Sequence, residues 1–124
     1  MKIKALYIKP DSAFSAYVKN WAEQAGVPVE DYDMKMVEDQ IADGLLLVNE
    51  NQDIPKDLYD FHTYFDHRHI PTQKIDVNGT LQVALTSFDI WLSSNKCKKI
   101  LILGADNLVK NDNLERFFSK IKMN

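Results

Sequence analysis

Cysteine and glycine are scarce in this sequence, which has one cysteine and four glycines among 124 residues. A single cysteine, Cys97, excludes an internal disulfide bond and favours an intracellular, cytoplasmic location. The glycines form neither of the glycine-rich patterns that bind nucleotide phosphates, Gly-x-Gly-x-x-Gly and Gly-x-x-x-x-Gly-Lys-Ser/Thr. We therefore expect no tightly bound dinucleotide and predict no cofactor.

Long apolar runs and a strong net charge are also missing. No run reaches the roughly 18 apolar residues that a membrane-spanning helix needs, and the first residues lack the apolar length of a signal peptide. The net charge of −3 argues against a nucleic-acid-binding module, because such modules concentrate Lys and Arg on one face. We expect one domain, residues 1–124, with no membrane span and no nucleic-acid partner.

Apolar stretches of two kinds alternate along the chain. Short runs of β-forming residues predict strands at 3–8, 27–34, 45–48, 72–77 and 99–103. Apolar residues at helical spacing predict helices after each strand, at about 12–25, 36–41, 55–69, 80–92 and 112–122. Asp11 or Ser12 is a candidate N-cap of the first helix, and Gly26 is a candidate left-handed C-cap.

This alternation requires crossover connections, and right-handed crossovers build a parallel sheet that is covered on both faces. The sequence therefore predicts a three-layer, doubly wound α/β domain with a five-stranded parallel sheet in the flavodoxin-like order 2-1-3-4-5. The wholly apolar strand 45–48 is expected at the centre of this sheet. The strand 27–34 contains Pro28 and several acidic residues, so we expect it at an edge.

In such a sheet the binding crevice lies beyond the carboxyl ends of the strands, where the connections diverge to opposite faces. For the predicted order this point is between the first and third strands. The candidate ligand-binding residues are the polar and turn residues that follow these strands and the fourth: Lys9, Asp11, Ser12, Asn49, Asn51, Asn78, Gly79 and Thr80. Gly104, Asp106 and Asn107 are expected farther out. The same residue types also form turns and helix caps, and that alternative stays open.

Two carboxylates are candidate catalytic groups. Glu50 lies two residues after the strand 45–48, and Asp60 lies on the helix after it. A general base at this position needs burial or a charged partner that shifts its pKa toward neutrality. A solvent-facing carboxylate is the alternative interpretation of each residue.

All three histidines lie between positions 62 and 69. On a helix His62, Asp66 and His69 share one face, and two imidazoles with a carboxylate could bind zinc or iron. One short helix rarely completes a metal site, however, and His and Arg are favoured at a helix C-terminus by the helix dipole. We predict no metal site and leave the metal-binding alternative open.

The first 75 residues resemble Toll/interleukin-receptor (TIR) domains. The likeness rests on the strand Leu6-Tyr7-Ile8, on the helix from Asp11 to Gly26-Val27, and on the segment from Asp53-Ile54-Pro55 to Ile70-Pro71. TIR-like enzymes cleave NAD with a glutamate on the helix after the third strand. Here that helix has Asp57, Asp60 and Asp66 but no glutamate. The resemblance therefore implies a non-catalytic signalling or assembly module.

We predict a non-enzymatic signalling or regulatory domain that binds a small ligand or a protein partner at the carboxyl edge of the sheet. The alternative is a hydrolase or transferase of nucleotides or nucleosides, including NAD-like substrates, with Glu50 or Asp60 as its carboxylate. Self-association through the last helix or the acidic edge strand is a further expectation.

Overall fold

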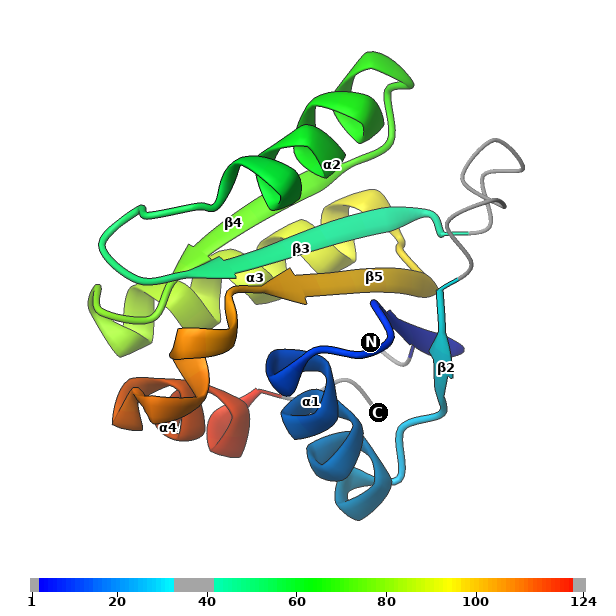
Figure 1. Cartoon of the computed structure of the whole chain (residues 1–124). Coiled ribbons are helices and arrows are strands. Elements are labelled where there is room, and N and C mark those ends of the chain that lie inside the picture. The colour runs from blue at the N-terminus through cyan, green and yellow to red at the C-terminus, as the bar shows by residue number, and fades with distance from the viewer. Residues whose placement is uncertain (1–2, 33–41, 122–124) are drawn as a thin grey trace.

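The computed structural model describes residues 3–32 and 42–121. Strands and helices alternate through these residues (Figure 1). The strands are β1 (Ala5–Ile8), β2 (Val29–Asp31), β3 (Gly44–Asn49), β4 (Thr72–Asp76) and β5 (Lys99–Gly104). The helices are α1 (Ala13–Ala25), α2 (Lys56–His67), α3 (Leu81–Asn95), the short 3₁₀ helix η2 (Asp106–Lys110) and α4 (Asp112–Lys120). The expected helix 36–41 falls outside the described residues.

All five strands are parallel and lie in the order β2-β1-β5-β3-β4. The predicted α/β class with a five-stranded parallel sheet is therefore confirmed, but the order 2-1-3-4-5 is wrong, because β5 lies between β1 and β3. β5, and not β3, is the central strand. The edge position of β4 has a physical reason, since its Gln73 and Lys74 would have to be buried if the strand had a neighbour on each side.

The other edge strand is β2, as predicted. Among the described strands it pairs only with β1, through Val29, Glu30 and Asp31. It begins at Val29 and not at residue 27 as expected, and residues 33–34 of the expected strand lie outside the described part. Pro28 lies just before it, and its carbonyl accepts a hydrogen bond from the Leu6 N–H. Acidic side chains remain in solvent at this edge.

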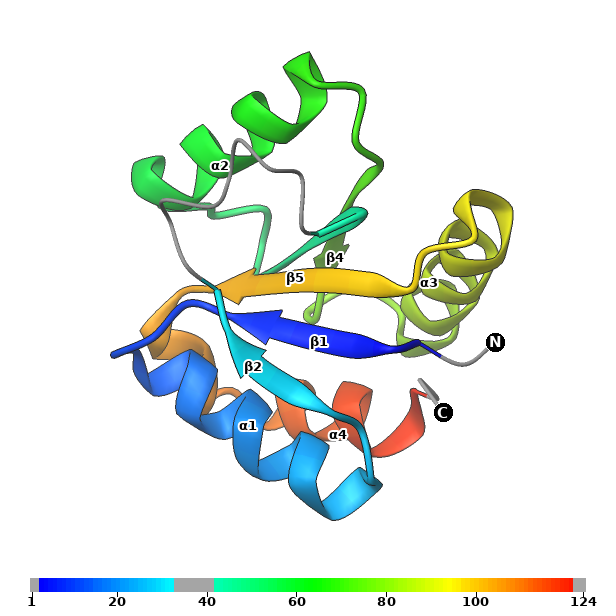
Figure 2. The ribbon, with the colours of Figure 1, turned by 90° about the vertical axis from the view of Figure 1, so that its right-hand side faces the viewer.

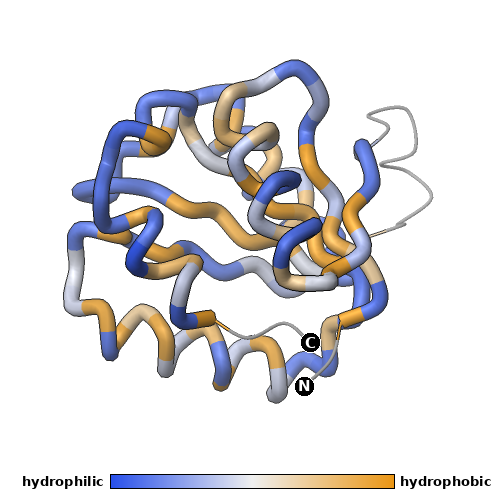
Figure 3. Tube along the Cα trace, turned by 90° about the horizontal axis from the view of Figure 1, so that it is seen from below, coloured by the Kyte–Doolittle hydropathy of each residue, from blue (hydrophilic) through white to orange (hydrophobic). Residues whose placement is uncertain are grey.

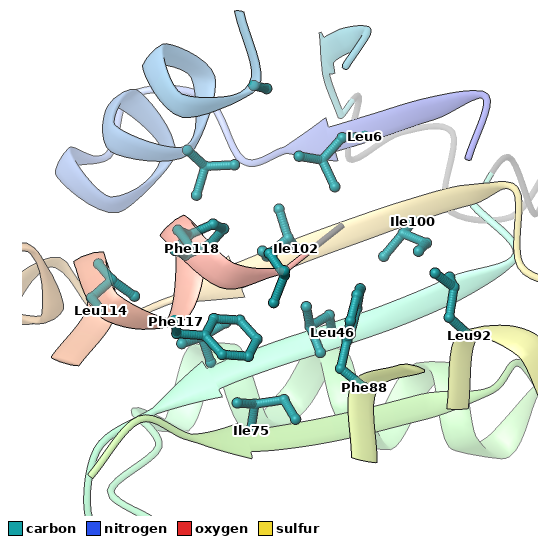
Figure 4. Packing of buried hydrophobic residues seen from close by; sticks show 14 of the residues in the cluster. Leu6, Leu46, Ile75, Phe88, Leu92, Ile100, Ile102, Leu114, Phe117 and Phe118 are labelled. Atoms are coloured by element: carbon teal, nitrogen blue, oxygen red, sulfur yellow. The ribbon is translucent and has the colours of Figure 1, made fainter. Parts of the chain in front are cut away.

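Helices cover both faces of the sheet (Figure 2). The two faces follow from alternation along the strands: Leu46 and Val48 of β3 face α1, α3 and α4, whereas Leu45 and Leu47 face α2. The larger core includes Phe117 and Phe118 of α4, which Figure 4 shows close to the sheet side chains. Figure 3 shows hydrophobic strands in the middle and helices whose hydropathy alternates. No helix in the described part is long and apolar enough to cross a membrane.

Both predicted caps of α1 are present. The Ser12 hydroxyl accepts a hydrogen bond from the Ser15 N–H at 3.0 Å, and Gly26 ends the helix with φ 75°. These caps fix where the chain leaves β1 and enters β2.

Burial determines the chemistry expected of Cys97. The thiol is 1% exposed, and burial together with the nearby Asp43 carboxylate raises its pKa from 9.0 to about 11. At pH 8 we expect iodoacetamide to modify native protein about a hundredfold more slowly than urea-unfolded protein, because the thiolate is the reacting form. Folding favours the protonated thiol, so this contribution to stability is present below pH 9 and is lost as the pH rises toward 11. Equal rates in the two states would contradict burial of the thiol.

Candidate functional site

A pocket of about 340 Å³ opens at the carboxyl ends of β1 and β5, next to the first turns of α1 and α2. We call it the strand-end pocket. Its lining residues are Lys9, Ser12, Ser15, Pro55, Asp57, Leu58, Leu103, Gly104, Ala105, Asp106 and Asn107. The chain leaves β3 toward α2 on one face and leaves β5 toward η2 and α4 on the other. The pocket therefore lies where the connections diverge, the position at which α/β sheets bind ligands.

One ion pair lines the strand-end pocket. The Lys9 Nζ and Asp57 Oδ2 atoms are 3.3 Å apart, and their side chains are 37% and 63% exposed. An ion pair this open to solvent stabilises the fold little. Both charges are therefore available to a ligand.

Two N–H groups in the first turn of α1 already donate hydrogen bonds to side chains of the protein. Asp106 Oδ1 accepts a hydrogen bond from the Phe14 N–H at 3.2 Å, while Ser12 caps the Ser15 N–H. The Asp106 carboxylate thus occupies a position where a ligand anion could otherwise meet the positive end of the helix dipole. Since Lys9 is opposed by two carboxylates, Asp57 and Asp106, the lining carries no excess of positive charge.

Asparagine amides surround Glu50. Its Oε2 accepts a hydrogen bond from the Asn111 amide at 2.8 Å, and its Oε1 accepts one from Asn107. The amides of Asn111 and Asn113 also donate to Asn78 Oδ1, at 2.8 and 3.0 Å. We call these five residues the asparagine cluster. It joins the segments that follow β3, β4 and β5, and so it holds one wall of the strand-end pocket through Asn107.

The second catalytic candidate, Asp60, lies on the outer surface of α2. Its carboxylate is 3.4 Å from the ammonium of Lys56, one helical turn earlier, and both side chains are largely exposed. Glu50 and Asp60 therefore bind different partners on different elements. The structure does not bring them together around one ligand.

The eight predicted ligand-binding residues separate into three groups. Lys9 and Ser12 line the strand-end pocket. Asp11, Asn51, Asn78, Gly79 and Thr80 form turns or helix starts, with left-handed backbone at Asp11 (φ 63°) and Asn51 (φ 54°). The Asn78 side chain also belongs to the asparagine cluster and lines the open hollow beside Glu50. Asn49 is buried at the end of β3 and lines a different pocket.

Sequence reasoning missed Ser15 and Asp57 as pocket residues. Each lies in the first turn of a helix, and only the helix phase turns its side chain toward the strand ends. Asp106 and Asn107 were expected farther out. They line the pocket because β5 is inserted between β1 and β3.

The histidine-rich segment forms ordinary side-chain contacts. His62 Nε2 lies 3.3 Å from the Thr72 hydroxyl, and the His62 ring stacks on the Tyr59 ring. Burial, together with the positive charge of Lys74, lowers the pKa of His62, although Asp66 acts in the opposite direction. Within residues 3–32 and 42–121 no group of three or more His, Cys, Asp or Glu side chains is arranged to hold a metal ion.

Comparison with known proteins gives one informative likeness. No family model and no curated protein matches the chain. Its structure is similar to that of a protein solved as "Putative molybdenum carrier protein" from Syntrophus aciditrophicus SB, with a TM-score of 0.73 over 94% of each chain. The two chains share a fold. At 14% sequence identity the likeness shows the α/β architecture alone, and the TIR resemblance stays a prediction.

Proposed function

We propose that the chain is a non-enzymatic, regulatory ligand-binding domain that holds a small polar molecule in the strand-end pocket. The observation that carries this proposal is the lining of that pocket: charged, hydroxyl and amide groups from three separate segments meet at the divergence point of the sheet. A volume of about 340 Å³ is at the lower end of the usual range for ligand pockets, which suits a small metabolite.

The charges of the pocket select the class of ligand. The Lys9 ammonium can meet a carboxylate of the ligand, and the Asp57 carboxylate can meet an amino group. A zwitterion such as an α-amino acid satisfies both charges at once, replacing a weak internal ion pair by two interactions with the ligand. We therefore propose a zwitterionic or neutral polar ligand.

The name of the structural neighbour suggests molybdenum as a second candidate cargo. Molybdate is a doubly charged anion, and in this pocket it would meet one lysine and two aspartates. The α1 N-terminus offers little compensation, because Asp106 and Ser12 already accept hydrogen bonds from its N–H groups. Because of this charge balance, we propose an oxyanion only as the second candidate ligand, after a zwitterionic or neutral polar molecule.

Calorimetry and thermal shift with the standard amino acids, molybdate and sulfate test the proposal. We expect at least one amino acid to bind and to raise the melting temperature. Lys9→Ala should weaken that binding about tenfold or more, the usual effect of losing a charged hydrogen bond. Lys56→Ala is the matched control, because it removes a lysine whose ion pair lies outside the pocket on α2. Binding that is unchanged in Lys9→Ala, or binding of molybdate alone, would overturn the assignment.

The enzymatic alternative has a separate test. Glu50 is bound by two asparagine amides, so its carboxylate is held in one orientation within an open hollow that Lys110 also lines. Incubation with NAD and with nucleosides, followed by chromatography, is expected to show no turnover. Turnover that is abolished by Glu50→Ala or Asp60→Ala would contradict a binding-only function.

A further inference from the structure

A second pocket, of about 390 Å³, lies between α2 and the edge strand β4. We call it the edge pocket. Its lining residues are Asn49, Gln52, Ile54, Tyr59, Lys74 and Asp76. None of them lines the strand-end pocket, so a ligand of the edge pocket would bind separately from a ligand of the strand-end pocket. Figure 1 shows α2 running alongside β3 and β4 above this part of the sheet.

Asn49 has a buried oxygen that is not hydrogen-bonded. The residue is 3% exposed, and its Oδ1 has no hydrogen-bond partner among the described residues. Its backbone is satisfied, since the Asn49 carbonyl accepts a hydrogen bond from the Val77 N–H at 2.9 Å. A buried acceptor without a donor is unfavourable, and an apolar residue here would avoid that cost. This oxygen is closed off from solvent, so a ligand that brings its own N–H or O–H group bonds to it once the Asn49 side chain turns toward the edge pocket.

Tyr59 provides an aromatic surface for the same ligand. Its side chain is 47% exposed, and its ring lies near-parallel to that of His62, with centroids 5.6 Å apart and planes at 19°. Ile54 adds apolar surface to the lining. An exposed ring at the mouth of a pocket is a stacking platform for a planar group.

The charges of the edge pocket cancel. Lys74 and Asp76 are its two charged lining residues, both on β4, and the Lys74 ammonium lies 5.8 Å from the Tyr59 ring centroid. Asp76 Oδ1 is already held, because it accepts hydrogen bonds from the N–H groups of Asn51 and Asn78 at 3.0 and 2.9 Å. The pocket therefore favours an uncharged ligand over an anion.

From these observations we propose that the edge pocket binds a planar, uncharged heterocycle that carries an amino group, of the nucleobase or nucleoside class. The amino group donates to Asn49 Oδ1, and the ring lies against Tyr59. The remaining polar groups of the lining, Gln52 and Lys74, bond to the edges of the ring or to its sugar.

Calorimetry with adenosine and purine riboside tests the role of the amino group, because the two nucleosides differ only in that group. We expect adenosine to bind about tenfold or more tightly than purine riboside, as the loss of a hydrogen bond to a buried acceptor predicts. AMP should bind no more tightly than adenosine, and D-ribose should not bind. Equal affinities for adenosine and purine riboside, tighter binding of AMP, or binding of ribose alone would each overturn the proposal.

Two variants locate the site. Asn49→Ala should weaken adenosine binding about tenfold, because it removes the acceptor of the amino group. Tyr59→Ala changes an exposed residue and should weaken binding about fivefold or more through lost stacking. Asn95→Ala is the control, since Asn95 bonds to the Trp91 carbonyl at the far end of α3. Unchanged affinity in both site variants would overturn the assignment, as would an equal loss in the control.

Discussion

Gly104→Ala is expected to lower the free energy of unfolding by about 2–3 kcal/mol. A Cβ atom at Gly104 would lie 2.6 Å from Cε2 of Phe14 and 2.7 Å from its Cζ, well inside van der Waals contact. The Phe14 ring is fully buried, so it has no solvent-filled space into which it can rotate. Urea denaturation of the variant and the parent chain measures the loss.

Gly79→Ala is the matched control for this experiment. A Cβ there would meet only the Asp76 carbonyl oxygen, at 3.3 Å, in an exposed turn, so we expect a loss below about 1 kcal/mol. Adding Phe14→Leu to Gly104→Ala should recover part of the stability, because the smaller side chain makes room for the methyl group. If the stability losses of the two single substitutions simply add in the double variant, the clash with Phe14 is not the cause of the loss in Gly104→Ala.

Phe117→Ala is expected to cost about 3–5 kcal/mol, which is the usual range for removing a buried phenylalanine side chain. The ring is 1% exposed and meets Phe118 and Phe88 edge to face, with centroids 5.6 and 6.3 Å away. Figure 4 shows it pointing from α4 toward Leu46 and Phe88. A thermal melt should show a decrease of roughly 10–20 °C in melting temperature.

Val83→Ala serves as the control for Phe117→Ala, because Val83 is 62% exposed on α3 and should change stability by less than about 0.5 kcal/mol. A loss below 1 kcal/mol for Phe117→Ala would mean that α4 is not anchored to the sheet through this ring. Since α4 has only nine residues, most of its stability has to come from this packing.

The alternation of strands and helices could be predicted from the sequence, because periodicity and caps are local signals. Ser12 and Gly26 mark the ends of α1 in the sequence as they do in the structure. The order of the strands depends on which apolar strand is central. Residues 45–48 and 100–103 are equally apolar and equally buried, so composition does not distinguish them. The polar residues Gln73 and Lys74 on β4 are a signal for an edge position, but the predicted order placed this strand inside the sheet.

The candidate site could be predicted only in part, for the same reason. Lys9 and Ser12 lie in the loop after β1, so their position at the carboxyl ends of the strands could be predicted without knowing which strand is central. Asp57 lines the pocket because its position on α2 turns the side chain toward the strand ends. Asp106 lines it because β5 lies beside β1. Asn49 was recognised as a polar residue at a strand end. That its oxygen is buried without a partner follows only from three-dimensional packing.

The central position of β5 has a consequence for synthesis of the chain on the ribosome. In the described sheet, the β1–β2 pair and the β3–β4 pair are linked by strand hydrogen bonds only through β5. Until residues 99–104 have emerged, a nascent chain can form two separate two-stranded units, and such units are barely stable alone. The edges of β1 and β3 that later receive β5 are then open to pairing with other chains. A chain truncated before Lys99 should therefore aggregate more readily than a chain truncated after Gly104.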